Sequence, residues 1–248
     1  MRPHRLIAAS VAGILVLMMS AAASASWIKY GKEICQTYAY ATGTVSVRTS
    51  DGCTIIAWVD EREELDRVYV QKIDDRGNIL WTRDGVSIFE SFYDMYSPRL
   101  AADGSGGVFV ACVTTALPVL GHEIYLQRID SEGNDAWGWG GLFLTYTSGE
   151  QSSCDIAEDG AGGVYVVWHD TRNNNYDIYA HHVDSDGYTG WPADGIPVVL
   201  GGPDQSYPII TSDGVGCAIV VWKDSRDDDG DVYAQRGFAN RSTLDVPS

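Results

Sequence analysis

Positive charge is scarce in this sequence. Lysine and arginine number 17 against 34 aspartates and glutamates, which gives a formal net charge of −17. Nucleic-acid-binding proteins neutralise phosphates with clusters of basic side chains, and the sequence contains no such cluster. The composition therefore argues against a nucleic-acid partner. A hydrophobic content of 45% supplies a sizeable core and excludes a disordered chain.

Cysteine is also rare. The sequence has five, an odd number at irregular spacings: Cys35, Cys53, Cys112, Cys154 and Cys217. Five cysteines are too few for a disulfide framework, and at least one thiol stays unpaired. A single bridge between Cys35 and Cys53 is left open. The cysteines also occupy different positions of the repeat described below, which argues against a repeated metal site.

The sequence has one long apolar run, and it lies at the N-terminus. Arg2 and Arg5 precede apolar residues from Leu6 to Met19, and Ala23-Ser24-Ala25 follows. This pattern is typical of a secretory signal peptide over residues 1–25, and the run is too short for a comfortable membrane span. We expect a mature chain of residues 26–248 without a membrane span, located in the periplasm, at the cell surface or outside the cell. Its charge would be 15 − 34 = −19.

Motifs of common enzymes are missing. The sequence lacks Gly-x-Ser-x-Gly, His-Glu-x-x-His, a glycine loop for phosphate and a cysteine–histidine pair at a useful spacing. Carboxylate pairs carry no information here, because some of the 34 acids will lie at a suitable separation in any fold. The sequence identifies no catalytic residue and no organic cofactor.

What the sequence does have is a repeat of 52 to 56 residues. Its anchors are Asp-Gly pairs that begin at Asp51, Asp103, Asp159 and Asp213. An apolar run follows each pair and ends in Trp58, Cys112, Trp168 or Trp222. An Asp-x-Arg step comes next in three repeats, starting at Asp60, Asp170 and Asp224, and the second repeat lacks it. Further on, a Trp-x3-Gly step begins at Trp81, Trp137 and Trp191. Such agreement at constant offsets indicates one structural unit per repeat.

Each repeat reads as four short strands. The runs that end at Trp168 and Trp222 are apolar at consecutive positions, which predicts strands buried on both faces. The Asp-Gly pairs supply hairpin turns, and no segment has a helical period. Four-stranded sheets at this spacing predict an all-β fold, a β-propeller of four blades with four antiparallel strands each. We place it at residues 26–240, followed by a tail at 241–248.

The two ends of the repeat array are complementary. The fourth repeat stops after Arg236 without a Trp-x3-Gly strand, and Trp27-x3-Gly31 supplies that strand at the front. We expect the N-terminal strand to complete the last blade and to close the ring. The alternative is a fragment of a larger propeller.

The segment Asp159-Gly-Ala-Gly-Gly-Val-Tyr-Val-Val-Trp-His-Asp-Thr-Arg172, followed by Asp177-Ile-Tyr179, resembles repeats of secreted bacterial propeller proteins of mostly unknown function. It is more distantly similar to TolB-like propellers. The resemblance covers Trp27 to Arg236 and implies an extracytoplasmic bacterial propeller, but it implies no catalytic residues. The Ser-x-Asp-x-Gly-x-Thr-Trp box of sialidase propellers is absent, which lowers the expectation of that enzyme class.

The acidic loop from Asp224 to Asp231 is the candidate metal site. Asp227, Asp229 and Asp231 offer oxygen ligands that suit calcium. Equivalent loops begin at Asp60 and Asp170, so the alternative is a hairpin tied by aspartate and arginine. A zinc site at His169, His181 and His182 is less favoured, because the last two occupy repeat positions and adjacent strand residues point to opposite faces.

The second repeat departs from the others and is the candidate ligand surface. It lacks the tryptophan and the Asp-x-Arg step, and its loop is longer and largely apolar. Candidate ligand-binding residues there are Tyr93, Tyr96, Leu117, Val119 and Trp139. Such aromatic and apolar groups suit a glycan or a protein partner. We expect a binding or interaction module; the alternatives are a carbohydrate-binding or carbohydrate-active propeller and a purely structural surface repeat.

Overall fold

The computed structural model describes residues 27–89, 93–117, 121–138, 140–227 and 230–238, which form antiparallel sheets that follow one another along the chain. The first sheet contains β1 (Ala41–Arg48), β2 (Thr54–Asp60), β3 (Arg67–Ile73) and β4 (Val86–Ser87). The second contains β5 (Met95–Ala102), β6 (Val108–Leu117), β7 (Gly121–Ile129) and β8 (Leu142–Phe143). The third contains β9 (Gln151–Glu158), β10 (Val164–Asp170), β11 (Asp177–Val183) and β12 (Ile196–Val199). The fourth contains β13 (Gln205–Ser212), β14 (Ala218–Asp224) and β15 (Asp231–Gly237).

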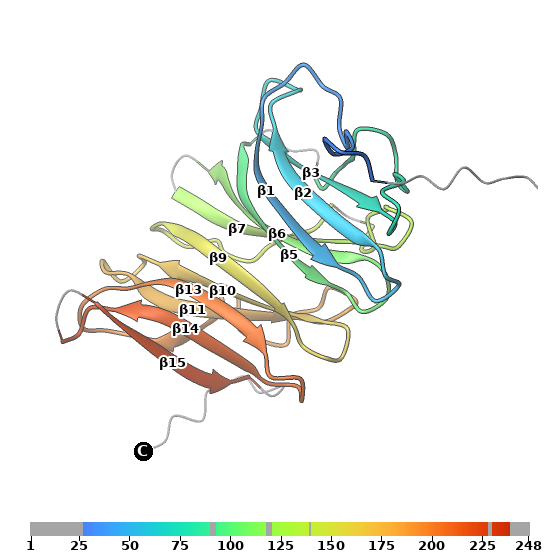
Figure 1. Ribbon diagram of the computed structural model, residues 1–248. Helices are drawn as coiled ribbons and strands as arrows, with labels where there is room; N and C mark the ends of the chain where they lie inside the picture. The colour runs from blue at the N-terminus through green and yellow to red at the C-terminus, as the bar shows by residue number, and fades with distance from the viewer. Residues whose placement is uncertain (1–26, 90–92, 118–120, 139, 228–229, 239–248) are drawn as a thin grey trace, which may run out of the picture.

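The sheets are the blades of a β-propeller, and this confirms the predicted fold class. They are arranged as a fan, with the first sheet at one end and the fourth at the other (Figure 1). Neighbouring sheets contact each other through their first strands, β1, β5, β9 and β13. Within the described residues no helix is long and apolar enough to cross a membrane.

Each buried cluster joins two neighbouring sheets. One cluster lies between the first and second sheets, one between the second and third, and one between the third and fourth. Because apolar side chains from both sheets interlock at each junction, burial fixes the angle between neighbours. Among the described residues no cluster joins the fourth sheet to the first.

The open fan corrects the expectation of a closed ring. The fourth sheet has only three strands within the described part of the chain, and β15 is its edge. Residues 27–36 lie against the first sheet instead: Trp27 Nε1 donates to the Asp75 carbonyl at 3.0 Å, and Lys32 Nζ donates to the Arg76 carbonyl at 2.9 Å. The prediction of two buried faces holds for β10, but β14 has a half-covered face because none of the described sheets packs on that side.

The Asp-Gly pairs form the expected hairpin turns. Asp159 Oδ1 accepts hydrogen bonds from the backbone N–H groups of Ala161 and Gly163, at 2.7 and 2.8 Å, and Asp103 and Asp213 cap their turns in the same way. The second carboxylate oxygen of each aspartate contacts a basic side chain on the third strand of its sheet. These pairs are Lys72–Asp51, Arg128–Asp103, His182–Asp159 and Arg236–Asp213.

The Asp-x-Arg step ties the next hairpin. In the third sheet, Asp170 Oδ2 accepts from Trp168 Nε1 at 3.0 Å and from Arg172 Nη2 at 2.5 Å. The Arg172 guanidinium lies over the ring of Tyr179 at 3.9 Å. The first and fourth sheets repeat this unit with Asp60 and Asp224. Buried charges paired in this way support a structural role for the step.

The Trp-x3-Gly step has a steric reason. Gly195 has a φ of +78°, and a Cβ there would lie 2.6 Å from the ring of Trp168. Gly85 stands in the same relation to Trp58. Only glycine permits both the backbone angle and the approach of the indole.

Candidate functional site

The calcium site predicted at Asp227, Asp229 and Asp231 is only partly described. The Asp227 carboxylate accepts a hydrogen bond from Tyr233 Oη at 2.8 Å, and Asp231 opens β15. Asp229 lies outside the described residues. Within the described ranges, no three or more histidine, cysteine, aspartate or glutamate side chains are grouped so that they could hold a metal ion.

The histidines considered for zinc serve separate contacts. His182 Nε2 lies 2.8 Å from Asp159 Oδ2, whereas His181 stacks on Trp191 with ring centres 6.2 Å apart. His182 thus occupies the repeat position that Lys72, Arg128 and Arg236 hold in the other sheets, as expected. All five cysteines are free, with Cys112 and Cys154 buried.

The five predicted ligand-binding residues of the second repeat are only partly described. Val119 and Trp139 lie outside the described residues. Leu117 pairs with Gly121 at the tip of the β6–β7 hairpin, and Tyr93 lies half-buried before β5. Tyr96, near the start of β5, has contacts that reach a larger polar cluster.

That cluster lies at one rim of the fan, and we call it the rim cluster: Tyr96, His122, Glu150, Ser152, His169, Tyr176 and Tyr207. The sheet topology explains why these residues meet. The first strands β5, β9 and β13 all begin at this rim, β7 begins there, and β10 ends there.

A short hydrogen-bond chain forms the centre of the rim cluster. Ser152 Oγ donates to Glu150 Oε1 at 3.2 Å and lies 2.6 Å from His169 Nε2. Because the serine hydroxyl hydrogen points to the carboxylate, His169 Nε2–H donates to the serine oxygen. Within this hydrogen-bond chain, the Glu150 side chain is still 45% exposed. Its carboxylate can therefore accept further hydrogen bonds from the solvent side.

Aromatic rings surround this chain. The Tyr96 ring meets His122 edge-on at 5.7 Å between ring centres, and His122 Nδ1 lies 3.6 Å from Glu150 Oε1. On the other side, the His169 ring lies 4.6 Å from Tyr176 and 5.9 Å from Tyr207. The Tyr207 side chain is 66% exposed. The rim therefore presents exposed aromatic surface beside a carboxylate.

Burial and charge set the protonation of these groups. Burial lowers the pKa of His169, so its imidazole is neutral at neutral pH. The negative charge of Glu150 raises the pKa of Tyr176. Burial, reinforced by the same charge, raises the pKa of Tyr96 to about 12. Both phenols are therefore neutral hydrogen-bond donors.

The arrangement does not complete a nucleophilic triad. In such a triad a carboxylate holds the second nitrogen of the histidine. His169 Nδ1 is buried and has no partner among the described residues, while the carboxylate lies on the serine side. The geometry suits polar recognition rather than activation of Ser152.

Below the rim cluster, charged side chains link three first strands. Arg99 on β5 lies 3.8 Å from Asp155 on β9, and Asp155 accepts a hydrogen bond from the Ile210 N–H of β13 at 2.9 Å. Burial raises the pKa of Asp155. These contacts hold the three strands in the positions that bring the rim residues together.

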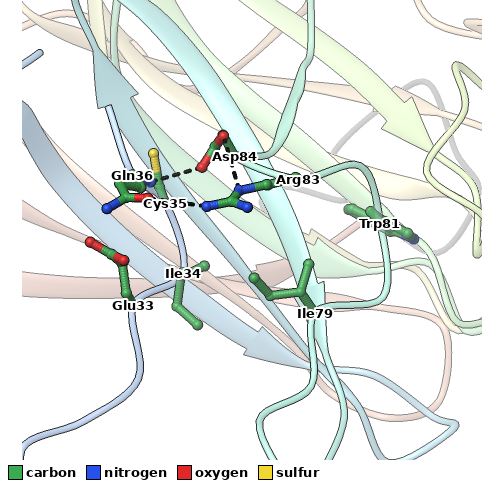
Figure 2. A pocket seen from close by; sticks show the side chains of 8 residues that line it. All are labelled: Glu33, Ile34, Cys35, Gln36, Ile79, Trp81, Arg83 and Asp84. Atoms are coloured by element: carbon green, nitrogen blue, oxygen red, sulfur yellow. Dashed lines mark hydrogen bonds and ion pairs between the residues drawn. The ribbon is translucent and has the colours of Figure 1, made fainter. Parts of the chain in front are cut away.

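A separate cavity of about 290 Å³ lies between residues 33–36 and the connection from β3 to β4 (Figure 2). Its polar groups bond one another: Arg83 Nη2 donates to Gln36 Oε1 at 3.1 Å, and the Gln36 N–H donates to Asp84 Oδ1 at 2.8 Å. These mutual bonds make it a poorer candidate for a ligand site than the rim cluster.

Sequence reasoning missed most of the rim cluster. It named Tyr96, and it considered His169 only as a metal ligand. The available signal was a departure from the repeat, since His169 stands where the other sheets have Val59, Val113 and Lys223.

No family model and no curated protein sequence matches this chain. Solved structures do resemble it in fold. A protein of unknown function from Dyadobacter fermentans has a TM-score of 0.52 at 10% identity, covering 81% of this chain and 67% of that one. An α-L-arabinanase from Penicillium chrysogenum, complexed with arabinobiose, has 0.50 at 13%, covering 82% and 64%. A polysaccharide lyase has 0.50 at 7%, covering 81% and 58%. This chain thus spans less than two thirds of the arabinanase and of the lyase, and these similarities establish the propeller fold.

Proposed function

We propose that the protein binds a carbohydrate at the rim cluster. The observation that carries this proposal is the exposed carboxylate of Glu150 among Tyr96, Tyr176 and Tyr207. Sugar rings present apolar C–H faces that stack on aromatic side chains, while their hydroxyl groups donate to carboxylates. Two of the solved structures with the same fold are an arabinanase and a polysaccharide lyase, which supports the choice of ligand class.

Each group has a defined role in this proposal. The Glu150 carboxylate accepts from sugar hydroxyls, and Tyr207 offers an exposed ring face. Ser152 and His169 position Glu150 through the hydrogen-bond chain and do not touch the sugar. The Asp loops remain structural ties in this account.

The test is calorimetric titration of the protein with arabinobiose, linear arabinan and a neutral β-glucan as probes. Tyr207→Ala and Glu150→Gln should each weaken binding about tenfold, as expected for loss of one stacked ring or one charge-assisted hydrogen bond. Tyr188→Ala is the matched control, because Tyr188 is 72% exposed in the turn between β11 and β12.

Two results would overturn the proposal. One is the absence of binding to all three probes; the other is binding that neither rim variant weakens. Reducing-end release measured in the same samples separates binding from hydrolysis, and release that Glu150→Gln abolishes would replace the binding role with a catalytic one.

A further inference from the structure

The outer face of the fourth sheet is largely apolar, and no other sheet of the described residues covers it. It carries Ile209, Ile219, Val221, Val232 and Ala234, which point away from the third sheet, and also Lys223 and Arg236, which pair directly with Val232 and Ile219. Val232 is 79% exposed, whereas the residues at its position in the other sheets, Val68, Ile124 and Ile178, are fully buried. Each of those three packs toward the next sheet. The fourth sheet therefore presents one half of the repeated junction without its partner.

The first sheet presents the other half. A cavity of about 270 Å³ lies on its free face, between the segment around Ile34 and the side chains of Ile56 and Trp58. Gly31 has a φ of +84°, close to the angles of Gly85 and Gly195. Those two glycines receive an indole from their sheet, but a Cβ on Gly31 would have nothing within 4 Å. The vacant position matches Trp222, which packs toward the third sheet as Trp168 packs toward the second. Among the described glycines, none receives the indole of Trp222 as Gly85 and Gly195 receive those of Trp58 and Trp168.

A turn carbonyl that accepts two hydrogen bonds at an internal junction has only one of these donors at the free face of the first sheet. Between the second and third sheets, the Ser185 carbonyl accepts from Trp137 Nε1 at 3.1 Å and from Arg128 at 2.8 Å. At the first sheet, the equivalent Asp75 carbonyl accepts from Trp27 Nε1 at 3.0 Å. The cation that would be its second donor is Arg236, whose side chain is 58% exposed and binds Asp213.

We propose that the outer face and the β15 edge of the fourth sheet dock on the first sheet and on residues 27–36 of a second copy of this chain, head to tail. A second copy fits better than closure within one chain. The three internal junctions are packed by buried side chains, and shutting the fan would require all of them to repack. A second copy continues the same junction without that change. The contact is heterologous, because it joins two different surfaces, and it yields a ring or a chain of copies.

Sedimentation velocity over a series of protein concentrations tests the proposal. The wild-type protein should form species of two or more copies, favoured by salt because the acidic chains repel one another. Val232→Glu buries a charge in the contact and should weaken association at least about thirtyfold. Val215→Glu is the control, since Val215 is 77% exposed at the β13–β14 turn and outside the outer face.

Mixing two variants identifies the head-to-tail geometry. Gly31→Ala blocks the position for Trp222 on the first sheet, and Val232→Glu blocks the fourth sheet. Each variant alone should stay monomeric, but an equal mixture should form dimers that stop at two copies. A wild-type protein that is monomeric at every concentration overturns the proposal, as does association of Gly31→Ala alone or a mixture that stays monomeric. These outcomes do not depend on carbohydrate binding.

Discussion

Glu123 is a buried carboxylic acid with one unpartnered oxygen. Its Oε2 accepts a hydrogen bond from Thr145 Oγ1 at 2.5 Å, and its Oε1 has no partner among the described residues. Burial raises the pKa of Glu123 to about 7, and the charges of Asp194 and Asp170 act in the same direction, against the opposing charge of Arg172. The folded protein therefore keeps this proton over a pH range in which the unfolded chain has lost it.

The sign of the resulting pH dependence follows from this difference. As pH rises from the ordinary value of 4.5 to about 7, the unfolded state binds fewer protons than the folded state, so the free energy of unfolding falls. Glu123→Gln removes this loss. We expect the variant to match the wild type at pH 5 and to exceed its stability by about 1–3 kcal/mol at pH 8.

Urea unfolding at the two pH values measures this effect. Glu132→Gln is the control, because Glu132 is an exposed glutamate in the turn after β7. An equal gain at both pH values would show that Glu123 is not protonated in the folded state.

Among the sheets, the second differs from its neighbours in the side chain that fills the space taken by a tryptophan in the first and third sheets. Where the first and third sheets place Trp58 and Trp168, the second has Cys112. Tyr125 fills the space: its hydroxyl donates to the Gly140 carbonyl, and its ring stacks on Phe89 with centres 4.7 Å apart. The loss of tryptophan is thus a local repacking of the core.

Restoring the repeat at this position should therefore destabilise the protein. Cys112→Trp adds an indole to a space that Tyr125 and Phe89 already occupy, and overpacking of this kind costs about 1–3 kcal/mol. Differential scanning calorimetry should show a lower Tm for Cys112→Trp and a partial recovery in Cys112→Trp combined with Tyr125→Ala. An unchanged or higher Tm would contradict the packing argument.

The comparison of elements also shows what the sequence could predict. Features that recur from unit to unit were accessible: the hairpins at Asp-Gly, the ties at Asp-x-Arg in three of the units and the strand order all follow from local chemistry. The rim cluster was not accessible, because Glu150, His169 and Tyr207 are distant in the sequence and meet only through the twist and order of three sheets. Tyr96 was found because it lies beside the segment where one repeat departs from the rest.

At the scale of the whole molecule, the sequence correctly predicted which segments pack against each other, but it did not predict that the fan of sheets stays open. Trp27 does occupy the Trp-x3-Gly position relative to the first sheet, through the same bond to a turn carbonyl that Trp137 makes. Whether that strand also reaches β15 depends on the rotation between successive sheets. This rotation is set by the combined volumes of buried side chains at three junctions, and the alternation of apolar residues carries no measure of it.

An open fan makes stability uneven along the chain. The second and third sheets are covered on both faces, whereas β15 has an exposed face and a free edge. In repeat architectures, each unit is stabilised by its contacts with its neighbours. The second and third sheets have a neighbour on each face, whereas the fourth sheet has a described neighbour on one face only. We expect amide hydrogens of β14 and β15 to exchange at least about tenfold faster than those of β6 and β10, measured by hydrogen–deuterium exchange on the dilute protein.

Measuring hydrogen exchange at several protein concentrations separates two reasons why the difference in exchange rate between the sheets could be absent. If copies associate head to tail, protection of β15 rises with protein concentration in the wild type, and Val232→Glu keeps the fast exchange. If the four sheets instead unfold only as one cooperative unit, protection is uniform at every concentration and in both proteins. Uniform protection in Val232→Glu would therefore refute the uneven stability, because that substitution removes the second copy and leaves the fan as it is.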